Sequence, residues 1–164
     1  MKMKYLFTSA ILLITGVCHA EAPNLRTVTE QFQDWQMVCV EKDARKQCRI
    51  NQTLVNEKGG TIAMFNLVKK ENGKHLVEIV LPLLLDLTKQ VNVTIDKKKT
   101  LKYPYNFCNN AACFVIADED SSLLNAFEKG DLGALGVSPI GKKEVKFNFS
   151  LKGFSAALAA LTKG

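Results

Sequence analysis

The chain has 164 residues, a length typical of one domain, and its hydrophobic share of 47% is close to that of ordinary globular proteins. These values exclude collagen-like, highly charged disordered and multi-domain chains. The excess of 22 Lys and Arg over 16 Asp and Glu is modest. Because the basic residues are scattered among acids, the charge pattern argues against a nucleic-acid-binding protein.

The first twenty residues have the pattern of a secretory signal. Two lysines precede an apolar stretch from Tyr5 to Val17, and Ala20 ends a small-residue cleavage site. The stretch is shorter than the roughly 20 residues that a membrane-spanning helix needs, and Val17 does not fit a lipoprotein attached through Cys18. We therefore predict cleavage after Ala20, a single exported β domain over residues 21–164, and no transmembrane segment after signal removal.

Removal of the signal leaves four cysteines, Cys39, Cys48, Cys108 and Cys113. An even number of cysteines in an exported chain favours disulfides. Three pairings are possible, and the simplest joins Cys39 to Cys48 and Cys108 to Cys113, which stabilises the fold by about 2 to 3 kcal/mol per bridge. A zinc site built from the four thiolates is the alternative, and the spacing and the oxidising compartment both argue against it.

Most of the exported domain is predicted to be β-strand. The terminal segment 21–30 is expected to be loose. Alternation of apolar and polar residues, or short apolar runs between turn formers, predicts strands at 35–40, 48–55, 61–67, 75–81, 91–95, 112–116 and 147–151. Short strands at this spacing indicate a β-sandwich or an open barrel, and we predict a β-sandwich-like domain.

The strongest hairpin signal is Asn72-Gly73, which lies between two apolar runs and tolerates positive φ. It predicts that strand 61–67 pairs with strand 75–81. Pro82 lacks an amide donor, so we expect it to end the second strand.

Two short helices are predicted. Ser121 or Ser122 can cap a helix that places Leu123, Leu124 and Phe127 on one face and ends at Lys129-Gly130. A second helix begins near Gly153, with Phe154, Leu158 and Leu161 at helical spacing. Both apolar faces are expected to lie on the sheets.

The exported domain contains little that could catalyse a reaction. His75 is its single histidine and follows a turn, so a solvated turn histidine is expected. The Asp118-Glu119-Asp120 triplet does not match a calcium loop and is better explained as acids at a helix start. Glycine-rich phosphate loops and Cys-x-x-Cys are absent from the sequence. We expect no enzyme activity, no metal and no cofactor.

Several motifs in order resemble the invasion-associated locus B family of exported proteins from Gram-negative bacteria. They are Trp35-x-x-x-Cys39 with Cys48, Leu81-Pro82-Leu83 before Val91-x-Val93-x-Ile95-Asp96, Tyr103-Pro104-Tyr105 before Cys108 and Cys113, and Phe149-Ser150-Leu151-Lys152-Gly153-Phe154. The chain departs from the family at Leu84 and Ala112, where glycine is usual, and at Thr88-Lys89-Gln90, where a Pro-Gly-type turn is usual. These departures concern turn geometry.

The resemblance implies an association with host-cell invasion or with the bacterial envelope, at the periplasm or cell surface. Because the residues offer no catalytic arrangement, we expect this role to be non-enzymatic. We expect contact with a protein partner through a sheet face or loops, and Trp35, Tyr103 and Tyr105 are the candidate contact residues. Trp35 has a second interpretation as a core residue beside the first disulfide. The alternative function is the binding of a small ligand or envelope glycan by a β-sandwich. The sequence specifies no oligomeric state.

Overall fold

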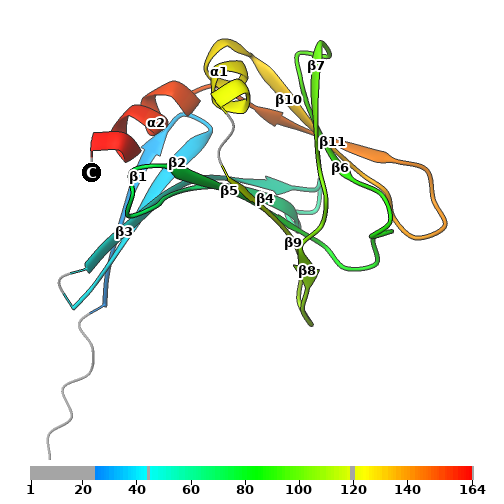
Figure 1. Cartoon of the computed structure of the whole chain (residues 1–164), viewed down its shortest axis with the longest axis horizontal. Coiled ribbons are helices and arrows are strands. Elements are labelled where there is room, and N and C mark those ends of the chain that lie inside the picture. The colour runs from blue at the N-terminus through cyan, green and yellow to red at the C-terminus, as the bar shows by residue number, and fades with distance from the viewer. Residues whose placement is uncertain (1–24, 44, 119–120, 164) are drawn as a thin grey trace, which may run out of the picture.

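The computed structural model describes residues 25–43, 45–118 and 121–163. Two antiparallel sheets and two helices form the β-sandwich-like domain that the alternation predicted. Figure 1 shows the larger sheet as a curved layer, with both helices on one side of it and the smaller sheet at its right-hand end.

The larger sheet has seven strands in the order β1-β2-β3-β4-β5-β9-β8. Their bounds are β1 Leu25–Phe32, β2 Trp35–Lys42, β3 Arg45–Val55, β4 Thr61–Lys69, β5 His75–Leu81, β8 Phe107–Cys108 and β9 Cys113–Asp118.

The smaller sheet has four strands in the order β11-β10-β6-β7, and the helices follow β9 and β11. The bounds are β6 Val91–Ile95, β7 Lys99–Tyr103, α1 Ser121–Lys129, β10 Leu132–Val137, β11 Val145–Ser150 and α2 Phe154–Lys163.

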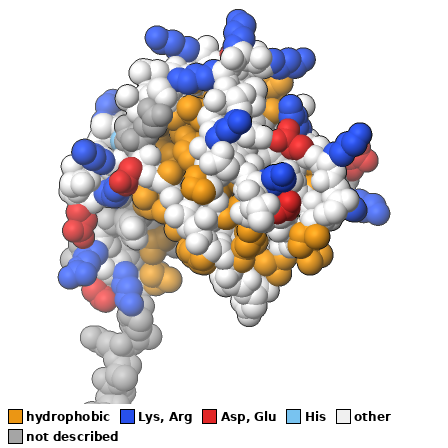
Figure 2. All heavy atoms as spheres, turned by 45° about the vertical axis from the view of Figure 1, so that its right-hand side comes forward, with side chains coloured by type: hydrophobic (Ala, Val, Ile, Leu, Met, Phe, Trp, Pro, Cys, Tyr) orange, Lys and Arg blue, Asp and Glu red, His pale blue; other side chains and the backbone are white. Residues whose placement is uncertain are grey.

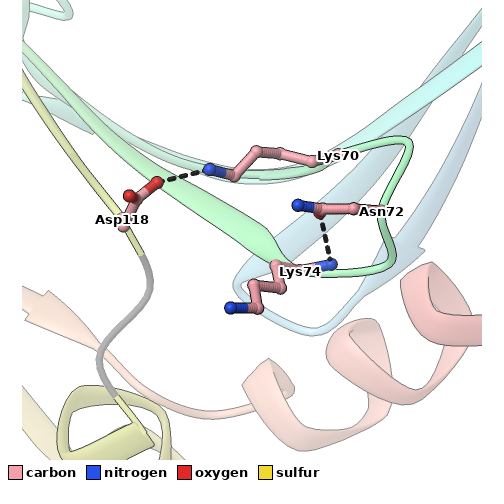
Figure 3. A network of polar contacts seen from close by, with 4 residues as sticks. All are labelled: Lys70, Asn72, Lys74 and Asp118. Atoms are coloured by element: carbon pink, nitrogen blue, oxygen red, sulfur yellow. Dashed lines mark hydrogen bonds and ion pairs between the residues drawn. The ribbon is translucent and has the colours of Figure 1, made fainter.

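The hairpin predicted at Asn72-Gly73 is confirmed. β4 pairs with β5 in antiparallel register, Gly73 has a φ of 78°, and β5 ends directly before Pro82. In Figure 3 the Asn72 side chain accepts a bond from the Lys74 amide at 3.1 Å, and Lys70 forms an ion pair with Asp118 of β9. The hydrogen bond from Lys70 and its charge lower the pKa of Asp118.

Aromatic rings at the centre of the core join the two sheets to the two helices. Trp35 and Phe65 come from the larger sheet, Phe149 from β11, Phe127 from α1 and Phe154 from α2. Neighbouring ring centroids lie 5.0 to 6.2 Å apart, in the range of favourable aromatic contacts. The core therefore depends on residues from every layer.

Both local disulfides are confirmed. Cys39–Cys48 crosses from β2 to β3 within the buried core, and Cys108–Cys113 joins β8 to β9 at the opposite edge of the sheet. Each pair occupies opposed positions in the strand register, which brings the two Cβ atoms close enough for a bond.

The prediction of a loose segment at residues 21–30 is wrong from Leu25 onward. β1 pairs with β2 along its full length, although nearly all its side chains are exposed. The β-branched Thr27, Val28 and Thr29 favour extended backbone. Main-chain pairing therefore forms this edge strand without the burial that a sequence pattern would show.

The helices begin and end close to the predicted positions, and their expected faces are buried. Leu123 and Phe127 of α1 are in the core, as are Phe154, Leu158 and Leu161 of α2. Neither helix is long and apolar enough to cross a membrane, within the part of the chain that the structure describes. The predicted signal and its cleavage site lie outside that part.

Candidate functional site

Trp35 is a core residue and offers no surface to a partner, so its prediction as a contact residue is wrong. Its side chain is fully buried, and its Nε1 donates to the Ser150 carbonyl at 3.0 Å. A tryptophan placed at the start of a strand can face either side of the sheet, and here the inner face holds Phe65 and Phe154. The second interpretation, a core anchor, describes its place in the fold.

Tyr103 and Tyr105 lie on either side of Pro104, where the chain leaves β7 of the smaller sheet and runs to β8 of the larger sheet. Both pack partly against the core and remain half-buried. Tyr103 ends β7 opposite Val91. Tyr105 lies near Asp86, a residue of the loop after β5. The two tyrosines stay candidate contact residues. Tyr105 lies next to the loop after β5.

Two loops far apart in sequence are fastened together at this end of the molecule. The loop after β5 and the loop after β10 form a bridge at Leu85 and Pro139. Asp86 N donates to Ser138 O at 2.8 Å, and Ile140 N donates to Leu84 O at 3.0 Å. Leu85 is buried and anchors the bridge in the core. Figure 1 shows both loops at the right-hand side.

The joined loops present a group of exposed apolar side chains, which we call the loop patch: Leu83, Leu84, Leu87 and Ile140. Their exposed fractions are 40%, 78%, 52% and 63%. Scattered single apolar residues are normal on a surface, but a group of large ones marks an interaction site. Figure 2, with this side turned forward, shows apolar side chains at the surface among Lys, Arg and acidic side chains.

Leu84 occupies a backbone conformation that leucine rarely adopts. Its φ is +67°, in the left-handed region where a glycine has no steric penalty. This is the position at which the sequence departs from the family's usual glycine. Holding a bulky side chain there costs about 1 to 2 kcal/mol. Because the Leu84 side chain is largely exposed, burial in the core does not offset this strain. Strained residues cluster at functional sites, which makes Leu84 a candidate contact residue.

Hydrogen bonds order the loop beside the patch. Asp86 Oδ1 accepts from Thr88 Oγ1 at 2.6 Å and from Thr88 N at 3.1 Å. These two bonds, with a smaller effect of Lys89, lower the pKa of Asp86. Burial, followed by the charge of Asp86, raises the pKa of Tyr105. Tyr105 is therefore a neutral hydroxyl beside an ionised carboxylate at neutral pH.

The outer face of the larger sheet is the other surface that could bind a partner. A polar row crosses it in register through Gln36, Asn51, Asn66 and Glu78. Gln36 Nε2 donates to Asn51 Oδ1, and Asn66 Nδ2 donates to Glu78 Oε2, both at 2.8 Å. These donors are paired within the sheet, and both asparagines are buried. Asn66 Oδ1 has no hydrogen-bond partner among the described residues, but it lies at a buried position in the middle of the sheet. The loop patch, in contrast, leaves apolar area in contact with water.

The expected histidine environment needs correction. His75 is not a solvated turn residue: it begins β5 and is buried, because the strand starts one residue after the turn and turns this side chain inward. Asp118 is exposed at the end of β9, while Glu119 and Asp120 lie outside the described residues. Within the described ranges no three His, Cys, Asp or Glu residues gather as a metal site.

Comparison with known proteins places these features in context. A model of the invasion associated locus B protein family matches residues 35–162. The crystal structure of invasion associated protein B from Bartonella henselae has a TM-score of 0.72 with 23% sequence identity, covering 83% of this chain and 95% of that chain. At this identity the likeness shows the fold alone. No curated protein matches.

Proposed function

Because the chain belongs to the invasion associated locus B family, an exported bacterial family, we propose that it acts by binding a protein partner through the loop patch. The partner is on a host cell or in the bacterial envelope, and no catalytic step is involved. The observation that carries the proposal is the exposed Leu84 and Ile140 pair on two joined loops.

The physical reason is the free energy of burying these side chains. Full burial of a leucine or isoleucine side chain contributes about 1.5 to 3 kcal/mol. In most interfaces a few side chains buried near the centre carry most of the affinity. The joined loops are also held by main-chain hydrogen bonds, so binding costs little ordering of the backbone.

The description of the Bartonella henselae protein as invasion associated supports host-cell association for this chain. We propose that the protein is located in the periplasm or at the outer surface of a Gram-negative bacterium, because an exported domain reaches partners in both places. Half-buried Tyr105 beside Asp86 would lie at the rim of this interface.

A binding assay with matched variants tests the proposal. The labelled protein is applied to cultured host cells and, separately, to bacterial envelope preparations. The double variant Leu84→Gly with Ile140→Ser should lose at least about tenfold in affinity for one of them, equivalent to about 1.4 kcal/mol. The control, Leu25→Ser with Val28→Ser, removes exposed apolar side chains from β1 and should bind normally. Equal binding by both variants would reject the loop patch.

A further inference from the structure

A groove lies between the end of β3, with the turn that follows it, and β11. It has a volume of about 940 Å³ and is lined by residues 52–58 on one wall and residues 146–150 on the other. Leu54 and Phe149 are apolar and buried at its base, and Ile62 adds to the apolar lining. None of the four loop-patch residues lines it. A volume of this size is typical of a ligand-binding cleft.

One wall of the groove is the free edge of β11. This strand ends its sheet, and five consecutive residues line the groove, which means that the strand's edge faces it. Leu151 N donates to Asp131 O at 3.1 Å, in register with the pairing of β10 and β11. Antiparallel bonds alternate along a strand, so the N–H and C=O groups of Lys146 and Asn148 point into the groove.

The other wall is a second open edge. The last residue pair between β2 and β3 is Gln36 with Asn51. β3 continues beyond this pair to Val55, so its final residues have no β2 partner. Asn56 N donates to Gly60 O at 2.9 Å across the hairpin to β4. By the same alternation the main-chain groups of Val55 point away from β4. The register shifts between Leu54 and Val55, but the extra residue, Ile62, belongs to β4. The alternation therefore continues along β3, and the main-chain groups of Thr53 also point away from β4. Two strand edges therefore border one groove.

A buried acceptor in the groove also needs a donor. Gln52 lines the groove and is 8% exposed. Its Nε2 donates to Asp34 O at 2.8 Å, but its Oε1 is buried without a hydrogen-bond partner among the described residues. Buried polar atoms are normally paired. A group bound in the groove could supply the missing N–H or O–H.

We propose that the groove binds an extended polypeptide segment of a partner, which pairs with the free edge of β11 as a fifth strand. Main-chain groups of the segment match the spacing of the exposed groups on Lys146 and Asn148. Alternate side chains of the segment face Leu54 and Ile62, so a sequence with apolar residues at every second position fits best. A donor from the segment satisfies Gln52 Oε1. This site is separate from the loop patch and stands if the loop patch fails.

Peptide selection tests the site on the purified exported protein with both disulfides formed. A displayed library of random linear peptides is panned against it, and the enriched peptides are synthesised. The test variant is Asn148→Pro, which removes one amide that points into the groove and takes no bond from β10. It should weaken peptide binding at least about tenfold. Asn148→Thr keeps that amide and should bind as the parent does.

A second control distinguishes the sheet edges. On β1 the alternation of bonds to β2 points the Thr29 amide outward, so Thr29→Pro blocks that edge and should leave peptide binding unchanged. If Asn148→Pro does not fold, amide hydrogen exchange on the parent protein replaces it, and bound peptide should slow exchange at Lys146 and Asn148.

Several results would overturn the proposal. They are failure to enrich any peptide, equal binding to the parent and to Asn148→Pro, and protection of β1 amides in place of β11 amides. Binding of envelope oligosaccharides that competes with the selected peptides and is insensitive to Asn148→Pro would assign the groove to a glycan, which also rejects strand addition.

Discussion

Neighbouring residues in one loop can have opposite importance for folding and binding, as Leu84 and Leu85 show. Leu85 is buried at the bridge between the two loops, whereas Leu84 is mostly exposed with a positive φ. The same residue type therefore serves the core at one position and the surface at the next. Stability measurements can separate the two roles.

We predict that Leu84→Gly changes the free energy of unfolding by less than about 1 kcal/mol, because relief of backbone strain offsets the greater entropy of an unfolded glycine. Leu85→Ala should cost about 2 to 5 kcal/mol, as expected for a buried leucine. Chemical denaturation of both variants checks this. A large loss in Leu84→Gly would show that its side chain supports the fold.

Gly153 is a residue that the fold requires to be glycine. Its φ is +88°, and a Cβ atom there would lie 2.0 Å from the carbonyl oxygen of Phe32. We predict that Gly153→Ala destabilises the protein by at least about 2 kcal/mol, since backbone strain and a steric clash add. Gly59 also has positive φ but open space around it. Thermal unfolding should show that Gly59→Ala costs less, and equal losses would contradict the clash.

Tyr105 gives the protein a pH dependence at alkaline pH. Burial, and then the Asp86 carboxylate, raise the pKa of the phenol in the folded state. A raised pKa contributes stability that is complete below the unfolded pKa, near 10, and is lost as pH rises through the folded value. We predict that this alkaline loss is smaller in Tyr105→Phe. Denaturation at several pH values, with phenolate absorbance, measures it, and identical profiles would contradict the assignment.

At the scale of elements, the two disulfides hold strands of unequal importance. Cys39–Cys48 is buried between two long strands, whereas Cys108 is exposed on β8, a strand of two residues. Replacing a disulfide by two alanines removes the restraint on the unfolded chain, worth about 2 to 3 kcal/mol for short loops. In the core it also leaves a cavity.

We therefore predict that the Cys39→Ala, Cys48→Ala pair lowers the unfolding free energy more than the Cys108→Ala, Cys113→Ala pair does. Denaturation curves for the two double variants make the comparison, and mass measurement confirms that the remaining bridge is intact in each. A larger loss from the second pair would show that the β8–β9 edge contributes more to stability than its burial indicates.

Sequence patterns predicted the elements whose faces differ in polarity, including β4, β5, β6 and both helices. β2, β3, β9 and β11 were also predicted, whereas β1, β7, β8 and β10 were not. β7 contains three lysine and tyrosine side chains at partly exposed positions, and β10 contains two glycines, one of which accommodates the Phe149 ring. Packing against other elements makes these segments strands, so a local pattern of apolar and polar residues could not predict them.

The candidate site was predicted only in part for a similar reason. The motif around Pro104 named Tyr105 as a candidate contact residue, which stays a prediction. The apolar run from Ile79 to Leu85 gave no such indication, because it contains both core and surface residues. Which of its leucines is exposed depends on the bridge to Pro139, more than fifty residues along the chain. The open edges of the groove likewise depend on where β2 begins and on which strand terminates the smaller sheet.

For the whole molecule, the two proposed binding regions lie on a shared core. Both sheets and both helices contribute to the aromatic core, and Figure 1 shows the smaller sheet at the right-hand end of the curved larger sheet. The loop patch lies on the joined loops after β5 and β10. The groove is lined by residues of β3, of the turn after it and of β11. Neither region requires a change in the fold to be accessible. The proposed function rests on the first region, and the proposed strand addition rests on the second.

The most direct test of the central claim is photo-crosslinking at the loop patch in the native bacterium during contact with host cells. A photoreactive amino acid replaces Leu84 or Ile140 in separate strains, and Val28 on β1 in a control strain. We predict that the two loop-patch positions give the same discrete protein adduct and that the β1 position does not. Absence of any adduct at both loop positions, or an identical adduct at Val28, would contradict binding through the loop patch.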